Sequence, residues 1–142
     1  MVVCEWIVRC RADEEAVLVC HLLAEQAASL FAVRDAELFV LAVHEAVVNA
    51  VKAVQRAGME AGTISLSFFV TSADVAVAVE DEGGGVPAEV IEQLDQMTLS
   101  DVLLAESGRG LLLIREIMDD VTWVEQKGGR RMLVMKMSRN AT

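Results

Sequence analysis

The chain has 142 residues, 54% of them hydrophobic, which is enough for a single domain over residues 1–142 with one sizeable core. Its 12 basic and 22 acidic residues give a formal net charge of −10, so direct nucleic-acid binding, which depends on a basic surface, is not expected. An acidic surface suits a basic protein partner better, although acidity also simply confers solubility.

The remaining bulk features favour a cytoplasmic protein. Cys4, Cys10 and Cys20 form no CxxC motif or Cys/His cluster and stand among apolar residues, as reduced buried thiols do. The first residues carry a charge at Glu5 and no small-residue cleavage site, so no signal peptide is predicted. No apolar run approaches the roughly 18–20 residues of a membrane span, so no membrane partner is expected.

The first half of the chain predicts a strand and two helices. Residues 2–11 alternate in polarity, which is typical of a strand with one face inward. Asp13 is a candidate N-cap for a helical pattern over residues 14–31. After a short break, Asp35 is a second candidate cap, ahead of a long helix over residues 38–56.

The second half predicts two hairpins with helices between them. Residues 63–70 and 74–81 alternate and form the first hairpin; a short helix over 87–96, a segment of weak periodicity over 97–107 and a helix over 111–118 follow. The last hairpin is predicted from residues 121–125 and 131–137. This order predicts an α+β fold, a two-layer sandwich in which one mixed, mostly antiparallel sheet is covered on one face by helices.

The long helix over 38–56 has two distinct faces. Glu45, Asn49 and Lys52 sit at i, i+4 and i+7, so they stack on one side over about two turns. This row is either a solvated helix side, the usual place for Glu and Lys, or a partly buried face whose Asn needs a partner, for which a metal ion is one candidate. The apolar face is expected to pack on a core and consists of Phe39, Val43, Ala46, Val47, Ala50 and Val54.

Two glycine-bearing loops stand at the ends of predicted elements. Asp81 closes a strand and is followed by three glycines, Gly83 to Gly85; Gly108-Arg109-Gly110 directly precedes a helix. Glycine lets a backbone approach a ligand closely or simply makes a tight turn, and N–H groups at a helix start can meet an anion. Neither loop matches a Walker motif or a GxGxxG fingerprint.

Taken in order, three segments resemble a known family. HEAVVNAVKA (44–53), EDEGGGVP (80–87) and SGRGLLLIREIMDDV (107–121) are similar to the N, G1 and G2 boxes of the GHKL ATP-binding fold, which histidine kinases and gyrase-type ATPases share. The short length, the N-terminal strand and helix, and the GRG…MDD signature look most like the bacterial anti-sigma-factor serine kinases of the RsbW type. The resemblance implies ATP and Mg²⁺ as cofactors.

The resemblance also implies roles for the charged and polar residues. Glu45 would be the general base for the attacking hydroxyl, and Asn49 would hold Mg²⁺ together with the triphosphate and water. Arg109 would offset charge on the transferred phosphoryl group, a role inferred from its place in the lid loop. Lys52 would contact phosphate or remain an exposed, salt-bridging lysine.

The adenine and lid positions follow from the same resemblance. Asp81 would accept a hydrogen bond from the adenine amino group, with Gly83 and Gly85 leaving space for the base. Gly108 and Gly110 would let the lid loop close on the phosphates.

Two positions depart from the family pattern. Ala53 stands where relatives often carry His, and the run over residues 128–131, GGRR, lacks the usual Gly-Thr. His21 and His44 are isolated in the sequence, so transfer through a phosphohistidine is not expected.

The leading hypothesis is an ATP–Mg²⁺-dependent protein serine/threonine kinase that acts as an anti-sigma factor. It would phosphorylate a STAS-domain anti-anti-sigma partner and sequester a sigma factor, and the family resemblance allows a homodimer. The alternatives are a regulatory binding module without kinase activity and a stand-alone ATPase or histidine-kinase-like fragment.

Overall fold

The computed structural model describes residues 1–84, 88–94, 109–127 and 131–140, and all structural statements below concern these residues. Five strands form one sheet in the order β1-β2-β3-β5-β4. The strands are β1 (Cys4–Arg11), β2 (Thr63–Val70), β3 (Asp74–Asp81), β4 (Asp120–Glu125) and β5 (Arg131–Ser138). The helices are α1 (Glu14–Leu30), α2 (Ala36–Arg56), α3 (Ala88–Leu94) and α5 (Arg109–Ile117).

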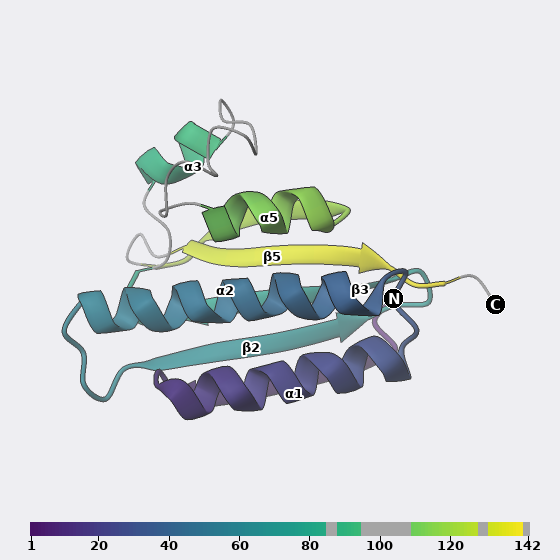
Figure 1. Ribbon diagram of the computed structural model, residues 1–142, viewed down its shortest axis with the longest axis horizontal. Helices are drawn as coiled ribbons and strands as arrows, with labels where there is room; N and C mark the ends of the chain where they lie inside the picture. Colours follow the sequence, from purple (N-terminus) through teal and green to yellow (C-terminus); the bar gives the residue numbers. More distant parts are fainter. Residues whose placement is uncertain (85–87, 95–108, 128–130, 141–142) are drawn as a thin grey trace.

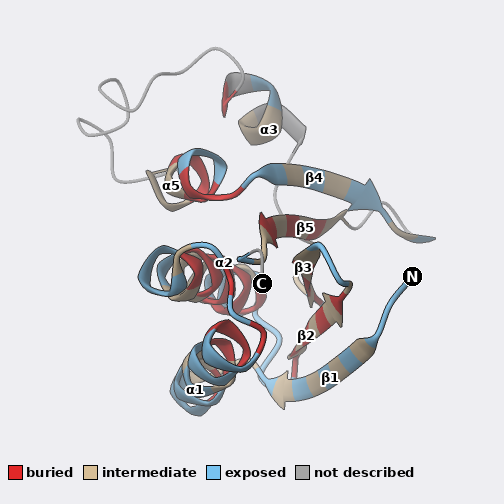
Figure 2. Ribbon diagram, turned by 90° about the vertical axis from the view of Figure 1, so that its right-hand side faces the viewer, coloured by how far each residue is buried: buried red, intermediate tan, exposed pale blue. Residues whose placement is uncertain are grey.

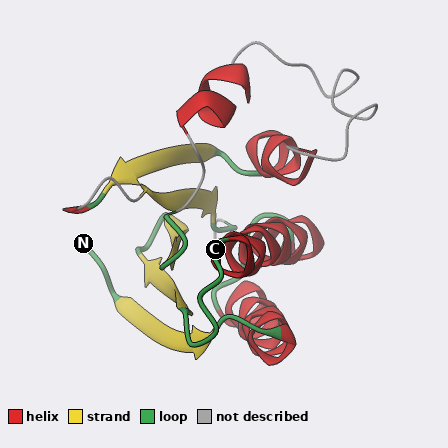
Figure 3. Ribbon diagram, turned by 90° about the vertical axis from the view of Figure 1, so that its left-hand side faces the viewer, coloured by secondary structure: helices red, strands yellow, loops and turns green. Residues whose placement is uncertain are grey.

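The helices α1, α2 and α5 lie side by side on one face of the sheet, and α3 lies beyond α5 (Figures 1 and 2). Seen from the other end, the sheet and the helices form two separate layers (Figure 3). This arrangement confirms the predicted α+β sandwich. Among the described residues, no helix combines the length and the apolar character that crossing a bilayer requires.

The sheet is more regular than the mixed sheet we expected. All of its described strand pairs are antiparallel. A strand that follows another after a helical connection commonly pairs with it in parallel, as the two strands of a βαβ unit do. Here β5 lies between β3 and β4, so these two strands do not pair with each other and every neighbour runs in the opposite direction.

The predicted caps and core of the helical layer are confirmed. The Asp13 carboxylate accepts a hydrogen bond from the Ala16 amide at 3.1 Å, and the Asp35 carboxylate accepts one from the Leu38 amide at 3.1 Å. Because Asp35 caps it directly, α2 begins at Ala36, two residues before the predicted start. The six predicted core residues of α2 are 0–4% exposed: Phe39, Val43, Ala46, Val47, Ala50 and Val54.

The end of α5 is held by side chains from outside the helix. The Arg34 guanidinium donates to the Ile117 carbonyl oxygen at 3.2 Å and to the Asp119 carboxylate at 3.3 Å. Asp119 also accepts a hydrogen bond from the Ser138 amide at 2.7 Å. These bonds satisfy a carbonyl group at the C-terminal end of α5 and tie that end to β5.

The loop after β3 is fixed to three other elements. The Glu82 amide donates to the Thr63 carbonyl oxygen at 3.2 Å, and the Arg131 amide donates to the Gly84 carbonyl oxygen at 3.4 Å. Gly83 lies against α2: a Cβ added to it would be 2.5 Å from both the carbonyl carbon and the carbonyl oxygen of Ala53. Only glycine allows so close an approach of two backbones.

The first testable prediction concerns this approach. We expect Gly83→Ala to lower the free energy of unfolding by about 3 kcal/mol, because the added methyl group meets backbone that no side-chain rotation can move. Gly58→Ala is the control: Gly58 has a φ of +70° but open space around it, so only about 1 kcal/mol of backbone strain is expected. Urea unfolding measures both values, and equal losses in the two variants would contradict the close packing of Gly83.

A second prediction concerns the cap of α1. The pKa of the Asp13 carboxyl is lowered below its ordinary value of 3.8. The largest cause is the hydrogen bond that it accepts from the Ala16 amide. A carboxyl whose pKa falls on folding stabilises the fold above its unfolded pKa and loses that contribution as the pH falls through the folded pKa. Asp13→Asn keeps a capping oxygen but does not ionise. The difference in free energy of unfolding between the wild type and Asp13→Asn should therefore shrink as the pH falls from about 6 to about 3. Urea midpoints across this range measure it, and a constant difference would contradict the assignment.

Candidate functional site

The polar face of α2 is partly covered by the rest of the protein. Glu45 and Asn49 are half-buried, whereas Lys52 is exposed. Glu45, Asn49 and Ala53 follow one another at i, i+4 and i+8, so they form a single row along the helix, which we call the α2 stripe. Of the two interpretations of this face, the partly buried one is therefore correct for Glu45 and Asn49.

The first turn of α5 lies directly on the α2 stripe. A Cβ added to Gly110 would be 2.7 Å from Oε2 of Glu45 and 3.4 Å from Nδ2 of Asn49. The structure thus brings together three predicted site residues that are far apart in the chain. The first N–H groups of a helix have no partner within the helix and carry partial positive charge. This contact therefore places the N-terminus of α5, which attracts anions, beside Glu45 and Asn49.

The loop after β3 covers the next part of the same stripe. Gly83 contacts the backbone at Ala53, one helical turn beyond Asn49. Asp81, directly before this loop, is only 7% exposed and is the one buried charged residue among those described. A carboxylate in such a position can hold a specific hydrogen-bond donor, since a buried charge requires polar partners.

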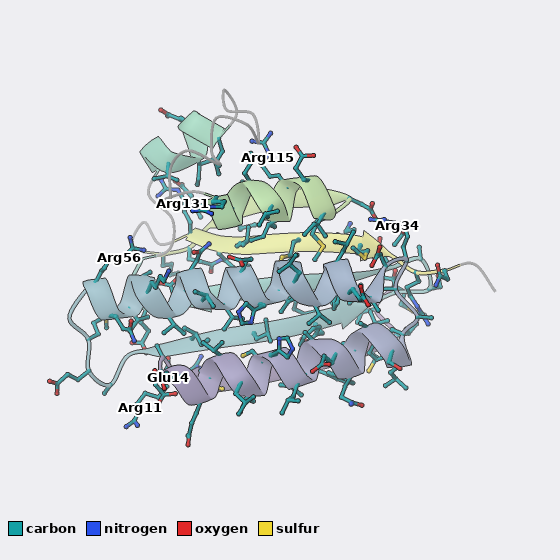
Figure 4. The ribbon with its side chains drawn as sticks, in the orientation of Figure 1. Arg11, Glu14, Arg34, Arg56, Arg115 and Arg131 are labelled. Carbon is teal, nitrogen blue, oxygen red and sulfur yellow. The ribbon has the colours of Figure 1, made fainter. Side chains whose placement is uncertain are left out.

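Basic side chains stand at the edge of this arrangement. Lys52 and Arg56 border a shallow hollow of about 370 Å³, whose described lining is completed by Gln55. Arg109 is half-buried at the start of α5, and Arg131 begins β5, where its amide bonds to Gly84. Figure 4 shows Arg56 at the end of α2 and Arg131 at the start of β5. Sequence reasoning missed Arg56 and Arg131, although Arg56 stands one turn after Lys52 and on the same side of the helix.

The two histidines, isolated in the sequence, contact each other in the fold. The rings of His21 on α1 and His44 on α2 meet edge-to-face with centroids 5.5 Å apart, and His21 Nε2 lies 3.4 Å from the Glu25 carboxylate. This contact packs the two helices together. The periodicity of each helix does not predict the contact between His21 and His44, because the two residues come from different helices.

The remaining predicted residues are Gly85 and Gly108, which lie outside the described residues. The donor set of the α2 stripe suits a small, hard cation, since Glu45 and Asn49 both offer oxygen ligands. In the described parts of the chain, no group of three or more His, Cys, Asp or Glu side chains gathers to hold a metal.

Comparison with known proteins gives the family to which the sequence belongs. The family model of the histidine kinase-like ATPase domain matches residues 10–137. Serine-protein kinase RsbW of Staphylococcus epidermidis is 33% identical over 97 residues, which are 66% of this chain and 61% of that protein. The protein of the same name from Staphylococcus aureus strain MSSA476 is 33% identical over 98 residues, with the same two coverages of 66% and 61%.

The chain thus spans about three fifths of the length of the curated relatives it matches. The family match extends over the α2 stripe, the loop after β3 and the first turn of α5, which confirms the resemblance seen in the three sequence segments. On this basis the chain belongs to the family of histidine kinase-like ATPase domains.

Proposed function

We propose that this protein is an ATP–Mg²⁺-dependent protein serine/threonine kinase that also acts as an anti-sigma factor. The observation that carries the proposal is the contact of the α5 N-terminus with Glu45 and Asn49. A phosphoryl-transfer site needs a carboxylate within reach of the attacking hydroxyl and positive partial charge beside the phosphates. The contact supports both requirements by bringing the Glu45 carboxylate to the N-terminal end of α5. Relatives named serine-protein kinase support the reaction class.

Each described residue then has a physical task. The N–H groups of the first turn of α5, which have no partner within the helix, and the Arg109 guanidinium hold the triphosphate. Asn49 contributes an oxygen ligand to Mg²⁺, which offsets phosphate charge when it is bound. Glu45 accepts the proton of the serine or threonine hydroxyl as that oxygen attacks the terminal phosphorus of ATP, whose bond to the bridging oxygen breaks so that ADP leaves. Asp81 accepts a hydrogen bond from the adenine amino group at the buried end of the site.

The partners follow from the motif resemblance and from charge. The acceptor would be a STAS-domain anti-anti-sigma protein, and the sequestered protein a sigma factor. The net charge of −10 favours a partner with a basic surface, since opposite charges speed association. We expect the protein to act in the cytoplasm, where sigma factors and ATP are found, and to form a homodimer as the resemblance allows.

The direct test replaces the proposed base. Glu45→Gln keeps the size and hydrogen-bonding capacity of the side chain but removes its ability to take a proton. We expect phosphate transfer from ATP to the cognate STAS-domain protein to fall by about 100–10,000-fold. The ATP dissociation constant, measured by titration calorimetry, should change by less than about threefold, because a base acts on the transition state rather than on bound ATP.

Glu60→Gln is the matched control, since Glu60 is exposed in the turn after α2 and should transfer phosphate at the wild-type rate. Wild-type protein that binds ATP but transfers no phosphate to its partner would favour the binding-module alternative. Steady ATP hydrolysis without any protein acceptor would favour the ATPase alternative.

A further prediction tests the contact between α5 and α2. In Gly110→Ala the new methyl group displaces the Glu45 carboxylate, which is a flexible side chain, so the fold survives. We expect the transfer rate to fall by about 100-fold, the effect of misplacing a reacting group by about 1 Å. The accompanying loss of thermal stability should vanish in the Glu45→Ala background, because the carboxylate that clashes is then absent. A stability loss that is equal in both backgrounds would contradict the contact.

A further inference from the structure

The strand β1 lies at one end of the sheet, and its outer edge is open. It pairs only with β2, and none of the described elements lies beyond it (Figure 2). About half of the backbone N–H and C=O groups of an edge strand point away from the sheet and can pair with another strand. β1 is eight residues long and contains no proline or lysine, the residues that commonly protect such an edge. Its edge can therefore accept a further strand.

This edge carries exposed apolar side chains. Ile7, in the middle of β1, is 68% exposed, and Val2 and Val3, directly before the strand, are 48% and 59% exposed. Ile7 lies on the face of the sheet that points away from the helices, because its neighbours Trp6 and Val8 pack against the core on the other face. An apolar side chain this exposed at an open edge gains burial when a second strand is added beside it.

Two opposite charges flank this isoleucine on the same face. Glu5 and Arg9 are both exposed and stand two residues before and after it. Nε of Arg9 donates a hydrogen bond to Oγ of Ser65 at 3.3 Å, so the guanidinium lies along the outer face of the sheet, and a guanidinium has further N–H groups for a carboxylate. The next basic residue, Arg11, is paired with Asp13 at 3.2 Å. The edge is thus locally neutral in a chain whose net charge is −10, so two copies of it repel each other less than the rest of the surface does.

We propose that β1 pairs in antiparallel fashion with β1 of a second copy of this chain, about a twofold axis at Ile7, so that the two sheets become one. In this register Ile7 faces Ile7 of the other copy. On either side of the axis, Glu5 of one copy faces Arg9 of the other. Two ion pairs therefore enclose an apolar contact, and the surface is complementary to itself, as a twofold interface requires.

The register follows from the pattern of side chains along β1. An axis between two residues sets the half-buried inner side chains of one copy against the charged outer side chains of the other. An axis at Trp6 keeps the faces but sets Ile7 against Glu5, and an axis at Val8 sets Ile7 against Arg9. Of these registers, the axis at Ile7 alone matches apolar with apolar and acid with base.

This pairing rests on the proposed function only for the expectation of a homodimer, to which it gives a surface. It requires no nucleotide and no phosphate transfer, because β1 carries none of the residues to which we assign the chemistry. Oligomeric state and kinase activity can therefore be measured independently of each other.

The first experiment measures the oligomeric state of the full chain by sedimentation equilibrium. We expect a mass of about twice the 15.4 kDa of one chain, which falls toward that of one chain on dilution. Glu5→Arg sets like charges opposite each other and should raise the dimer dissociation constant at least about tenfold, although it lowers the net negative charge of each copy. Arg9→Glu should do the same. The double variant Glu5→Arg/Arg9→Glu restores both ion pairs with their signs exchanged, and its dissociation constant should lie within about threefold of the wild-type value.

A second pair of variants tests the apolar centre. Ile7→Lys places two ammonium groups at the axis and should also raise the dissociation constant at least about tenfold. The side chain is exposed, so the fold should be kept, and thermal melting checks this. Val124→Lys is the matched control, because Val124 is exposed on β4, at the other edge of the sheet, and this variant should dimerise as the wild type does.

Two native cysteines report the register. Cys4 and Cys10 lie on the inner face of β1, about 20 Å apart along the strand within one chain. With the axis at Ile7, Cys4 faces Cys10 of the other copy with Cα atoms about 5 Å apart, a separation that a disulfide spans. Oxidation with copper phenanthroline should therefore give a covalent dimer in which mass spectrometry finds the peptides of Cys4 and Cys10 joined. Cys4→Ala should give no such dimer.

The proposal is overturned if the wild type is a monomer, or if its dimer persists unchanged in Glu5→Arg and Ile7→Lys. It is also overturned if the oxidised dimer lacks the bond between Cys4 and Cys10. A monomer that transfers phosphate refutes the interface and leaves the kinase proposal intact, whereas a dimer that passes these tests without transferring phosphate does the reverse.

Discussion

The packing of α2 on the sheet is the constraint from which the site follows. A helix can turn about its own axis unless one face is held, and the apolar face of α2 is held by a core that leaves its residues 0–4% exposed. Because the apolar face is held against the core, the direction in which Glu45 and Asn49 point is fixed as well. Hydrophobic packing, which has no chemical specificity of its own, therefore sets the orientation of the two side chains to which we assign the chemistry.

The electrostatics of the site are local rather than global. A chain with a net charge of −10 repels a polyanion at long range, and salt screens that repulsion beyond about 10 Å. Close to α2 the balance is different, because Lys52, Arg56 and Arg109 stand near the positive end of α5. In the proposed function, a few near charges and backbone dipoles bind the nucleotide, and the acidic remainder of the surface stays available for a basic protein.

Local patterns predicted local features well and distant contacts poorly. The caps at Asp13 and Asp35 and the core face of α2 were predictable because each depends on residues within a few positions. The position of β5 between β3 and β4 and the pairing of His21 with His44 were not, since strand order and helix contacts join distant segments. The approach of Gly110 to Glu45 was expected only through family resemblance, because spacing within one segment does not report on another.

The fit of Gly110 beneath Glu45 also bears on how such sequences can diverge. As long as a full-length acid occupies position 45, a side chain at position 110 would have to displace it, so we expect glycine to be favoured there. A lineage that replaced the acid with a smaller residue would relieve the collision and free position 110 to vary. Substitutions at the two positions should therefore occur together among descendants, and a lineage with alanine at position 110 should often lack the acid at position 45.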